Sequence, residues 1–405
     1  IRYGHRIGKA RWSSADNLWT IEATRADTGE TVTFTAGFLW MCQGYYRHSQ
    51  GYTPEWPGFG DYQGRVVHPQ TWPDDLDLAG QRVVVIGSGA TAVTIVPAMA
   101  EGGAGHVTML QRTPTWMFTR PAKDAVANFL RAVLPEKLAY RLTRFKNIKM
   151  QDFSFKLARD NPQKVKDALY KKIEEALGPD YDKASFTPPY NPWEQRLCLV
   201  PDQDLFTAMK AGKADVVTGH IAKFEKGGVL LTDGQFIPAD IVVTATGLKL
   251  AVAGKIAISV DGEPVEFSQR FYYKGCMFSN LPNLAVVFGY LNASWTLRAD
   301  INSDYVCRVL EHMRKTGTTI ATPVLTPAGE AAITEDDVFD FSSGYIQRGK
   351  HIMPRNSVSY PWRLNQEYVV DRKRMKDDPL TDGILTFTRA GANAQRGEEQ
   401  LEAAE

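Results

Sequence analysis

The stretch QRVVVIGSGATA, residues 81–92, constrains the fold more than any other part of this chain. Four β-branched residues at 83–86 lead directly into a glycine-rich turn, which predicts a buried strand that breaks into a helix. Gly87 suits the tight turn, Gly89 allows the backbone to approach a pyrophosphate, and Ala92 allows close packing of helix on strand. The residues expected to bind a dinucleotide are therefore Gly87, Ser88, Gly89, Ala90, Thr91, Ala92 and Val93.

The sequence that follows completes a β-α-β unit and ends in a cation. An apolar helix at 94–100 precedes a strand at 107–110, and Gln111, Arg112 and Thr113 come directly after it. An NAD site usually has Asp or Glu at this position for the ribose 2'-hydroxyl, whereas an arginine suits a 2'-phosphate. A charge-assisted hydrogen bond of about 1.5–3 kcal/mol would favour NADPH over NADH about 10- to 150-fold. We therefore expect Gln111 and Arg112 at the cofactor; the alternative is an arginine that merely ends a strand in solvent.

Two segments of the chain repeat one layout, in which a β-meander is followed by a strand that stops at a glycine. The first segment spans residues 8–44 and the second spans residues 221–247. Because the second closes the nucleotide-binding half that starts at residue 81, the first should close an earlier half with its own glycine motif. The chain is therefore expected to lack a leading nucleotide-binding half. Gly44 and Gly247 stand at the two crossing points, where a residue without a side chain lets the backbone pass close to a cofactor.

The composition is that of a globular protein without a bias toward a charged partner. The 405 residues and the 43% apolar content allow two or three domains. The net charge of +1 gives no overall attraction to nucleic acid, and we expect none to bind. Four well-separated cysteines without metal-ligand spacing predict reduced, buried thiols in a cytoplasmic protein and no metal site. No apolar run reaches the roughly 20 residues that cross a bilayer.

A basic helical segment interrupts the nucleotide-binding pattern. Its last helix should be capped by Asn161, begin with Pro162 and end at Gly178. The apolar residues with helical spacing in it are Val165, Leu169, Ile173 and Ala176. Residues 137–172 hold eleven Lys or Arg against three Asp. Such a run is typical of the solvated face of a helical insertion; contact with anionic lipid headgroups is the alternative, and it would make the protein membrane-associated.

These patterns predict an α/β, Rossmann-like three-layer fold with two dinucleotide-binding domains, the first of them truncated. A late helix, at about 297–313, should follow a strand at 284–288 and have Asn292 or Ser294 as its N-cap. The expected parts are a remnant of the first domain at 1–50, an inter-domain linker at 51–79, the NADP-binding domain at 80–246 with a helical insertion at about 118–190, a return to the first domain with the substrate region at 247–390, and a disordered tail at 391–405.

Residues 62–73, YQGRVVHPQTWP, resemble the F-x-G-x-x-x-H-x-x-x-W-P fingerprint of Baeyer–Villiger monooxygenases, with Tyr62 in place of Phe. As in that family, they lie just ahead of the glycine motif. Other segments resemble the subgroup that contains the mycobacterial ethionamide-activating monooxygenase, namely CQGYY, WPDDLDLAGQRVVVIGSGATAV, HVTMLQRTP, NPWEQRLCLVP, ADIVVTATGL, NASWTLRAD and YPWRLNQ. The resemblance covers nearly the whole chain. Members of the family begin with an FAD-binding G-x-G-x-x-G half, which this sequence lacks.

The resemblance implies a flavoprotein oxidoreductase that reduces FAD with NADPH and then reacts with O2. A C4a-peroxyflavin would insert oxygen into ketones, giving esters, or oxygenate the sulfur of sulfides and thioamides. A fixed cation must stabilise such an anion in a dry site. Arg196 falls where the family has its active-site arginine, although Gln195 replaces the lysine that many members carry before it. An ion pair with a carboxylate such as Asp202 is the alternative role for Arg196.

The resemblance also implies roles for residues in the linker and near the crossing points. His68 and Trp72 are expected to belong to the catalytic machinery by fixing its hinge geometry. A general base at His68 and plain packing of Trp72 are the alternatives. The residues expected at FAD are Ile7, Gln43, Gly44, Asn292, Trp295 and Thr296, and those expected at NADP are Thr246 and Gly247. Trp295 as an ordinary core aromatic is again an alternative.

Two other functions stay open. A flavin monooxygenase that oxidises nitrogen or sulfur without Baeyer–Villiger activity is disfavoured by Arg196 and by the linker around His68. A non-catalytic NADP-binding fragment follows if no FAD-binding half accompanies these residues. Under the leading interpretation the partners are O2 and a lipophilic small molecule. The apolar character of the expected pocket wall suggests this, and its residues are Trp193, Leu197, Cys198 and 360–362.

Overall fold

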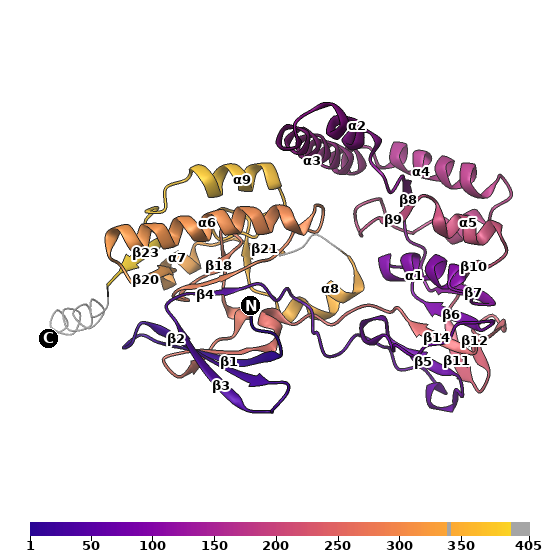
Figure 1. The fold of residues 1–405 in the computed structure, drawn as a ribbon, viewed down its shortest axis with the longest axis horizontal. Coiled ribbons are helices and arrows are strands. Elements are labelled where there is room, and N and C mark those ends of the chain that lie inside the picture. The colour runs from indigo at the N-terminus through magenta and orange to yellow at the C-terminus, as the bar shows by residue number, and fades with distance from the viewer. Residues whose placement is uncertain (338–341, 390–405) are drawn as a thin grey trace. The chain divides into compact units, whose positions relative to one another are not determined.

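The computed structural model describes residues 1–337 and 342–389, which form two compact units (Figure 1). Unit 1 consists of Ile1–Arg47, Leu250–Asp340 and Ile346–Glu405, and unit 2 consists of His48–Lys249 and Phe341–Tyr345. The tail expected at 391–405 lies outside the described residues. Each unit is described below by itself.

Unit 2 is built on a five-stranded parallel sheet in the order β10-β7-β6-β14-β5. The strands are β5 (Arg65–Val67), β6 (Arg82–Ile86), β7 (His106–Gln111), β10 (Ala214–Thr218) and β14 (Ile241–Thr244). The strand and helix expected after residue 82 are confirmed, because β6 runs into α1 (Ala90–Glu101) through the glycine turn. The α/β fold class is confirmed with them.

The apolar run of β6 is explained by burial of both faces of this sheet. Val83 and Val85 belong to the core shared with α1 and with α5 (Asp204–Lys210). Val84 and Ile86 belong to the core shared with a second, antiparallel sheet. That sheet consists of β11 (Ile221–Glu225), β12 (Gly228–Leu231) and β13 (Phe236–Pro238). Unit 2 therefore has three layers, with helices on one face of the parallel sheet and a β-meander on the other (Figure 1).

The expected helical insertion lies between β8 (Met117–Arg120) and β9 (Cys198–Pro201), which pair in parallel. Its helices are α2 (Ala125–Val133), α3 (Glu136–Asp160) and α4 (Pro162–Leu177), with a 3-10 turn at Lys183–Phe186. Helix α4 begins and ends as expected: Pro162 opens it and Gly178, at φ 98°, closes it. Asn161 stands at the N-cap, but its side chain makes no capping hydrogen bond.

The segment expected as an aperiodic linker contains a strand that the sequence did not indicate. Strand β5 pairs with β14 and forms the edge of the parallel sheet. Three residues are too few to display an alternation of polar and apolar side chains, so no periodic signal was available. Short 3-10 turns at Phe59–Asp61 and Pro69–Thr71 lie before and after it.

Unit 1 contains the first expected meander, formed by β1 (His5–Ser13), β2 (Leu18–Arg25) and β3 (Thr31–Ala36). Trp12 and Trp19 lie on its buried face with ring centroids 5.6 Å apart. The sheet continues beyond β1 with β15 (Ala257–Val260) and β16 (Glu263–Pro264). The alternating sequence therefore predicted the strands of the meander correctly. It did not predict the parallel pairing of β1 with β15, because this pairing joins segments about 250 residues apart.

A buried asparagine holds a second part of unit 1 together. Strand β4 (Leu39–Met41) pairs in parallel with β19 (Leu284–Val286), directly after Asn283. The Asn283 amide donates to the carbonyls of Gly37 and Thr319 at 2.6 and 2.8 Å, and its oxygen accepts from the Ala321 N–H at 2.7 Å. This one side chain thus links three strand ends.

The late helix of unit 1 is α6 (Trp295–Thr316), which begins two residues before and ends three residues after the expected 297–313. It contacts α9 (Tyr368–Asp377). Ser294 is its N-cap residue without a side-chain capping bond. The other elements are β17 (Tyr272–Tyr273), β18 (Met277–Phe278), β20 (Ile320–Pro323), α7 (Pro327–Ala331), β21 (Glu335–Asp336), α8 (Gly344–Gly349), β22 (Asn356–Ser357) and β23 (Leu385–Thr388), with 3-10 turns at Val252–Lys255, Phe267–Gln269 and Lys350–Ile352.

The prediction of four buried thiols is wrong for two of them. Cys198 and Cys276 are buried, but Cys42 and Cys307 are exposed, and all four are free. Cys42 follows the end of β4 and Cys307 lies on the solvent side of α6, so neither position is part of a core. Within residues 1–337 and 342–389, no helix has the length and apolar character needed to cross a membrane.

Candidate functional site

The glycine turn of unit 2 has a geometry that only small residues permit. Gly87 has φ 140°, and a Cβ there would fall on the carbonyl oxygen of Ala245, with the carbonyl carbon at 3.0 Å. Gly89, at φ −75°, is the N-cap of α1, and a Cβ there would meet no described atom within 4 Å. Gly87 is therefore required by the fold, whereas Gly89 leaves open space in front of the helix.

The start of α1 offers backbone N–H groups to an anion. Gly89, Ala90 and Thr91 are exposed, and the first turn of the helix contains no acidic residue. The N–H groups there and the helix dipole favour a pyrophosphate. Two of the residues expected at the nucleotide have another role, because Ala92 and Val93 are buried in the core and the Val93 N–H donates to Gly89 O. Their side chains therefore face the core, and a nucleotide contact through the Ala92 backbone N–H stays a prediction.

Gln111, the last residue of β7, and Arg112, which follows it, lie in opposite environments. Gln111 is wholly buried, and its amide donates to Ser185 O at 2.7 Å and to Thr218 Oγ1 at 3.0 Å. The Gln111 amide nitrogen is thus used within unit 2, and the expected contact of this residue with the cofactor stays a prediction. Arg112 is exposed and makes no hydrogen bond or ion pair with any described residue. It is thus available for an anion such as a 2'-phosphate.

A set of hydrogen bonds joins the glycine turn to the strand that follows Arg196. Ser88 Oγ donates to Thr113 O at 2.8 Å, and Cys198 Sγ lies 3.7 Å from Ser88 O. The Cys198 thiol also contacts Thr115 Oγ1 at 3.8 Å, and burial raises the pKa of the thiol to about 11. Arg196 is exposed and lies two residues before this anchor. Asp202, its alternative partner, accepts a hydrogen bond from the Ala122 N–H.

His68 and Trp72 differ in their surroundings. His68 follows the end of β5; its Nδ1 accepts from the Gln70 N–H at 3.1 Å, while its Nε2 is buried and has no partner among the described residues. The ring packs on Gly51, where a Cβ would overlap it. Trp72 is 40% exposed, and both its hinge role and the packing alternative stay predictions.

The segment after β14 is fixed to the chain that enters unit 2. Thr246 Oγ1 donates to Tyr52 O at 2.6 Å, and the Tyr52 N–H donates to Gly247 O at 3.0 Å. Gly247 has φ 105°. The ends of β5, β6, β7 and β14 thus bring His68, Gly87, Arg112 and Thr246 to the carboxyl edge of one parallel sheet, where ligands bind in open α/β folds.

The residues expected at FAD lie in unit 1, at several places. Gln43 packs against Gly254, Gly44 has φ 75° in open space, and Ile7 is exposed on β1 beside a bulge in its pairing with β2. Trp295 stacks on Tyr45, with ring centroids 5.0 Å apart, and covers Gly289. Trp295 is half-buried in this packing, so its place at FAD and its alternative role as a core aromatic both stay predictions. Thr296 is exposed, and Asn292 Nδ2 donates to Gln366 O at 3.1 Å.

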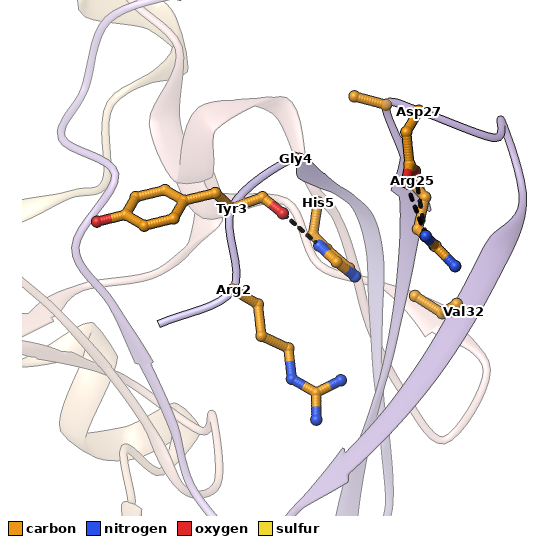
Figure 2. Close-up of a pocket in the computed structure, with 8 residues that line it drawn as sticks. Arg2, Tyr3, Gly4, His5, Arg25, Asp27 and Val32 are labelled. Atoms are coloured by element: carbon orange, nitrogen blue, oxygen red, sulfur yellow. Dashed lines mark hydrogen bonds and ion pairs between the residues drawn. The ribbon is translucent and has the colours of Figure 1, made fainter.

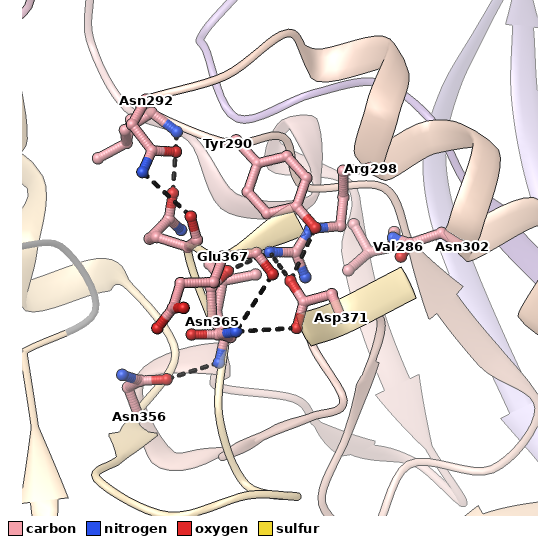
Figure 3. Close-up of polar contacts among 12 residues, drawn as sticks. Val286, Tyr290, Asn292, Arg298, Asn302, Asn356, Asn365, Glu367 and Asp371 are labelled. Atoms are coloured by element: carbon pink, nitrogen blue, oxygen red, sulfur yellow. Dashed lines mark hydrogen bonds and ion pairs between the residues drawn. The ribbon is translucent and has the colours of Figure 1, made fainter. Parts of the chain in front are cut away.

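A buried ion pair that the sequence did not indicate supports this part of unit 1 (Figure 3). Arg298 is fully buried on α6, and its guanidinium bonds to Asp371 Oδ2 at 2.9 Å and lies over the Tyr290 ring at 4.1 Å. Tyr290 OH and the Asn365 amide also donate to Asp371, at 2.7 and 3.2 Å. Burial raises the pKa of Tyr290 well above its ordinary value. The pair joins residues 73 positions apart, so no local pattern could reveal it.

A surface hollow of about 660 Å³ lies at the edge of the unit 1 meander (Figure 2). It is lined by Arg2, Tyr3, Gly4, His5, Arg25, Ala26, Asp27 and Val32. Arg25 is already paired with Asp27 at 2.7 Å, and His5 Nδ1 lies 2.7 Å from Tyr3 O. None of the residues expected at a cofactor lines this hollow.

Comparisons with known proteins fit the geometry of unit 2. The flavin-binding monooxygenase-like family matches residues 5–317. The chain is 44% identical to a probable FAD-binding monooxygenase AlmA of Acinetobacter sp and to the FAD-containing monooxygenase EthA of Mycolicibacterium smegmatis, covering 96% of this chain and 78% of each relative. A steroid monooxygenase solved with NADP has a similar fold, with a TM-score of 0.67 at 18% identity over 96% of this chain and 81% of that one.

These similarities confirm the α/β dinucleotide-binding fold and the prediction of a flavin-dependent monooxygenase, with FAD and NADP as the cofactors of such enzymes. They leave the expected Baeyer–Villiger subgroup and the substrate as predictions. The chain belongs to the flavin-binding monooxygenase-like family.

Proposed function

We propose that this chain is an FAD- and NADPH-dependent monooxygenase of Baeyer–Villiger type, which inserts one oxygen atom of O2 into ketones to give esters and oxygenates the sulfur of sulfides and thioamides. The observation that carries the proposal is the convergence of His68, Gly87, Arg112 and Thr246 at the carboxyl edge of the parallel sheet in unit 2. We further propose that residues 80–246 form the NADP-binding domain.

Each group at this edge has a part in binding NADPH. The exposed N–H groups of Gly89, Ala90 and Thr91 would hold the pyrophosphate. Arg112, without a partner among the described residues, would pair with the 2'-phosphate. Thr246 is already bonded to Tyr52, so its part is to fix the backbone beside Gly87. The donor set therefore fits a phosphorylated dinucleotide.

The oxygenation step needs a cation that stays charged. FAD, when bound, supplies the redox chemistry and the activation of O2. Arg196 keeps its charge at every working pH, and the Cys198 anchor holds its strand against Ser88 of the glycine turn. We therefore propose Arg196 as the residue that stabilises negative charge during oxygen transfer. His68 and Trp72 would set the geometry of the linker through which the nicotinamide approaches and withdraws.

The first experiment is a visible absorption spectrum of this polypeptide with added FAD, followed by NADPH under air. We expect flavin bands that bleach and then return. A colourless protein that still binds NADPH would contradict the proposal for this polypeptide and favour the non-catalytic alternative.

The second experiment tests the reaction itself with an aryl ketone and a thioether, with products identified by mass spectrometry. We expect Arg196→Ala to lose oxygenated product by at least about 100-fold while flavin reduction by NADPH is kept. The control is Arg131→Ala, which removes an exposed arginine of α2 and should change neither rate. Sulfoxide formation without any ester from the ketone would replace the Baeyer–Villiger assignment by the N- or S-oxidising one.

A further inference from the structure

The helices α2 and α3 carry an apolar surface that is exposed instead of buried. We call it the α2–α3 surface, and it consists of Val126, Phe129 and Val133 on α2 with Leu138, Leu142, Phe145 and Phe153 on α3. Their exposed fractions lie between 41% and 64%. Of the 25 residues of α3, only Ala139 and Ala158 are buried. The residues of the α2–α3 surface therefore do not serve the core of unit 2.

The spacing of these residues places them in one stripe on each helix. On α2 the intervals are three and four residues. On α3 the surface residues lie at 138, 142, 145 and 153, at intervals of four, three and eight, with Lys149 at the position between the last two. These are the intervals at which side chains share a helix face. Figure 1 shows α2 beside α3. Lys146 of α3 pairs with Asp124, which caps α2 through the Ala127 N–H, so polar side chains join the two helices.

Unpaired cations flank the stripe. Helix α3 has seven Lys or Arg against three Asp or Glu, and Glu136 and Asp160 are its first and last residues. Asp152 pairs with Lys156 at 3.1 Å. Lys137 and Arg141 make no ion pair with any described residue, and Lys149 lies 6.0 Å from the centroid of the Phe145 ring within the stripe itself. The surface is thus both apolar and positively charged.

The charge decides between two occupants. A second copy of the chain in a symmetric dimer would bring the same cations face to face, which costs energy. A bilayer surface with anionic lipids offers negative headgroups to the cations and an acyl boundary to the apolar side chains. No helix of the described residues can span a bilayer, so any membrane contact of these helices lies in the interface.

We propose that the α2–α3 surface docks this protein on membranes that contain anionic lipids, with Phe129 and Phe145 entering the acyl boundary and Lys137, Arg141 and Lys149 binding headgroups. This docking is independent of the proposed reaction, because it needs neither cofactor nor substrate. It would place unit 2 where lipophilic molecules accumulate.

The test is flotation of the purified chain with vesicles of phosphatidylcholine alone or with 30% phosphatidylglycerol. We expect binding to the anionic vesicles only. Lys137→Gln/Arg141→Gln/Lys149→Gln should weaken partitioning by about 100-fold, or about 3 kcal/mol for three cations near the surface. Phe129→Ser and Phe145→Ser should each weaken it about 10-fold or more.

Matched control variants show whether vesicle binding depends on this surface or on exposed charged and apolar side chains anywhere in unit 2. Lys210→Gln/Lys213→Gln/Lys226→Gln removes three exposed lysines elsewhere in unit 2, and Phe236→Ser removes an exposed phenylalanine of β13. Both should bind vesicles like the unchanged chain. Equal losses in test and control variants, or no binding to anionic vesicles, would overturn the proposal. So would a concentration-dependent dimer in light scattering that Phe145→Ser abolishes, because the surface would then join two copies of the chain.

Discussion

The two glycines of the turn after β6 should respond to the same substitution in opposite ways. At Gly87 an added Cβ meets the Ala245 carbonyl and the backbone has φ 140°, which a side chain disfavours. Strain from such a backbone costs roughly 1–3 kcal/mol, and overpacking against a fixed strand end costs roughly another 1–3 kcal/mol. Gly87→Ala should therefore lower the free energy of unfolding by roughly 2–6 kcal/mol.

Gly89→Ala should leave stability almost unchanged, because its Cβ meets no described atom and φ is −75°. The weaker N-cap costs about 1 kcal/mol at most. The new methyl group would, however, occupy the space in which a pyrophosphate approaches the backbone. An overlap of roughly 1–3 kcal/mol weakens NADPH binding about 5- to 150-fold.

The two variants are compared by urea unfolding followed by circular dichroism and by calorimetric titration with NADPH. Gly87→Ala should unfold at lower urea, whereas Gly89→Ala should unfold like the unchanged chain and bind NADPH more weakly. Unchanged NADPH affinity in Gly89→Ala would refute the assignment of this turn to the pyrophosphate. Equal destabilisation by both substitutions would refute the geometric distinction between the two positions.

Three further predictions concern single side chains. Arg112→Gln should weaken NADPH binding about 10- to 150-fold and leave NADH binding unchanged, because only the 2'-phosphate contact is lost; equal losses for both nucleotides in titrations would contradict this. Hydrogen bonds from Arg82 lower the pKa of Asp240 to about 2, below its unfolded value of about 3.9, so their contribution is present above about pH 4 and lost as the pH falls toward about 2. Since both groups are about a third or more exposed, Asp240→Asn should cost about 1 kcal/mol or less in thermal unfolding at pH 7, and a cost that persists at pH 2 would exclude this cause. Asn283→Ala should cost about 2–5 kcal/mol in urea unfolding because it removes three hydrogen bonds and leaves the buried Ala321 N–H unpaired, and a cost below about 1 kcal/mol would show that water replaces these bonds.

The sequence predicted the elements whose signals are local. The β-branched run at 83–86, the alternation of the first meander and the caps of α4 each depend on neighbours within a few residues. Strand β5 was not predicted because three residues are too few to show an alternation of polar and apolar side chains. Cys42 was predicted to be buried but is exposed, because the exposure of a residue after a strand depends on which distant segments pack over it.

Side-chain roles were harder to predict than elements. Gln111 is the last residue of β7, where the nucleotide motif places it, yet its buried amide donates to Ser185 and Thr218, which lie far along the chain. The Arg298–Asp371 pair likewise depends on a contact across 73 positions. Motif spacing gives the position of a backbone turn, but it does not tell which neighbouring side chain faces the ligand.

The thiol of Cys198 makes the glycine turn accessible to a simple chemical measurement. Its burial and its high pKa keep it from reacting while Ser88 O covers it, whereas Cys42 and Cys307 are open to reagents at once. Because Cys276 is buried as well, the two slow thiols are distinguished by mass spectrometry of the labelled peptides, and the labelling rate of Cys198 then reports how often the turn separates from β9. A nucleotide bound at the turn would make these openings rarer. The labelling rate of Cys198 would therefore report how long the nucleotide stays bound.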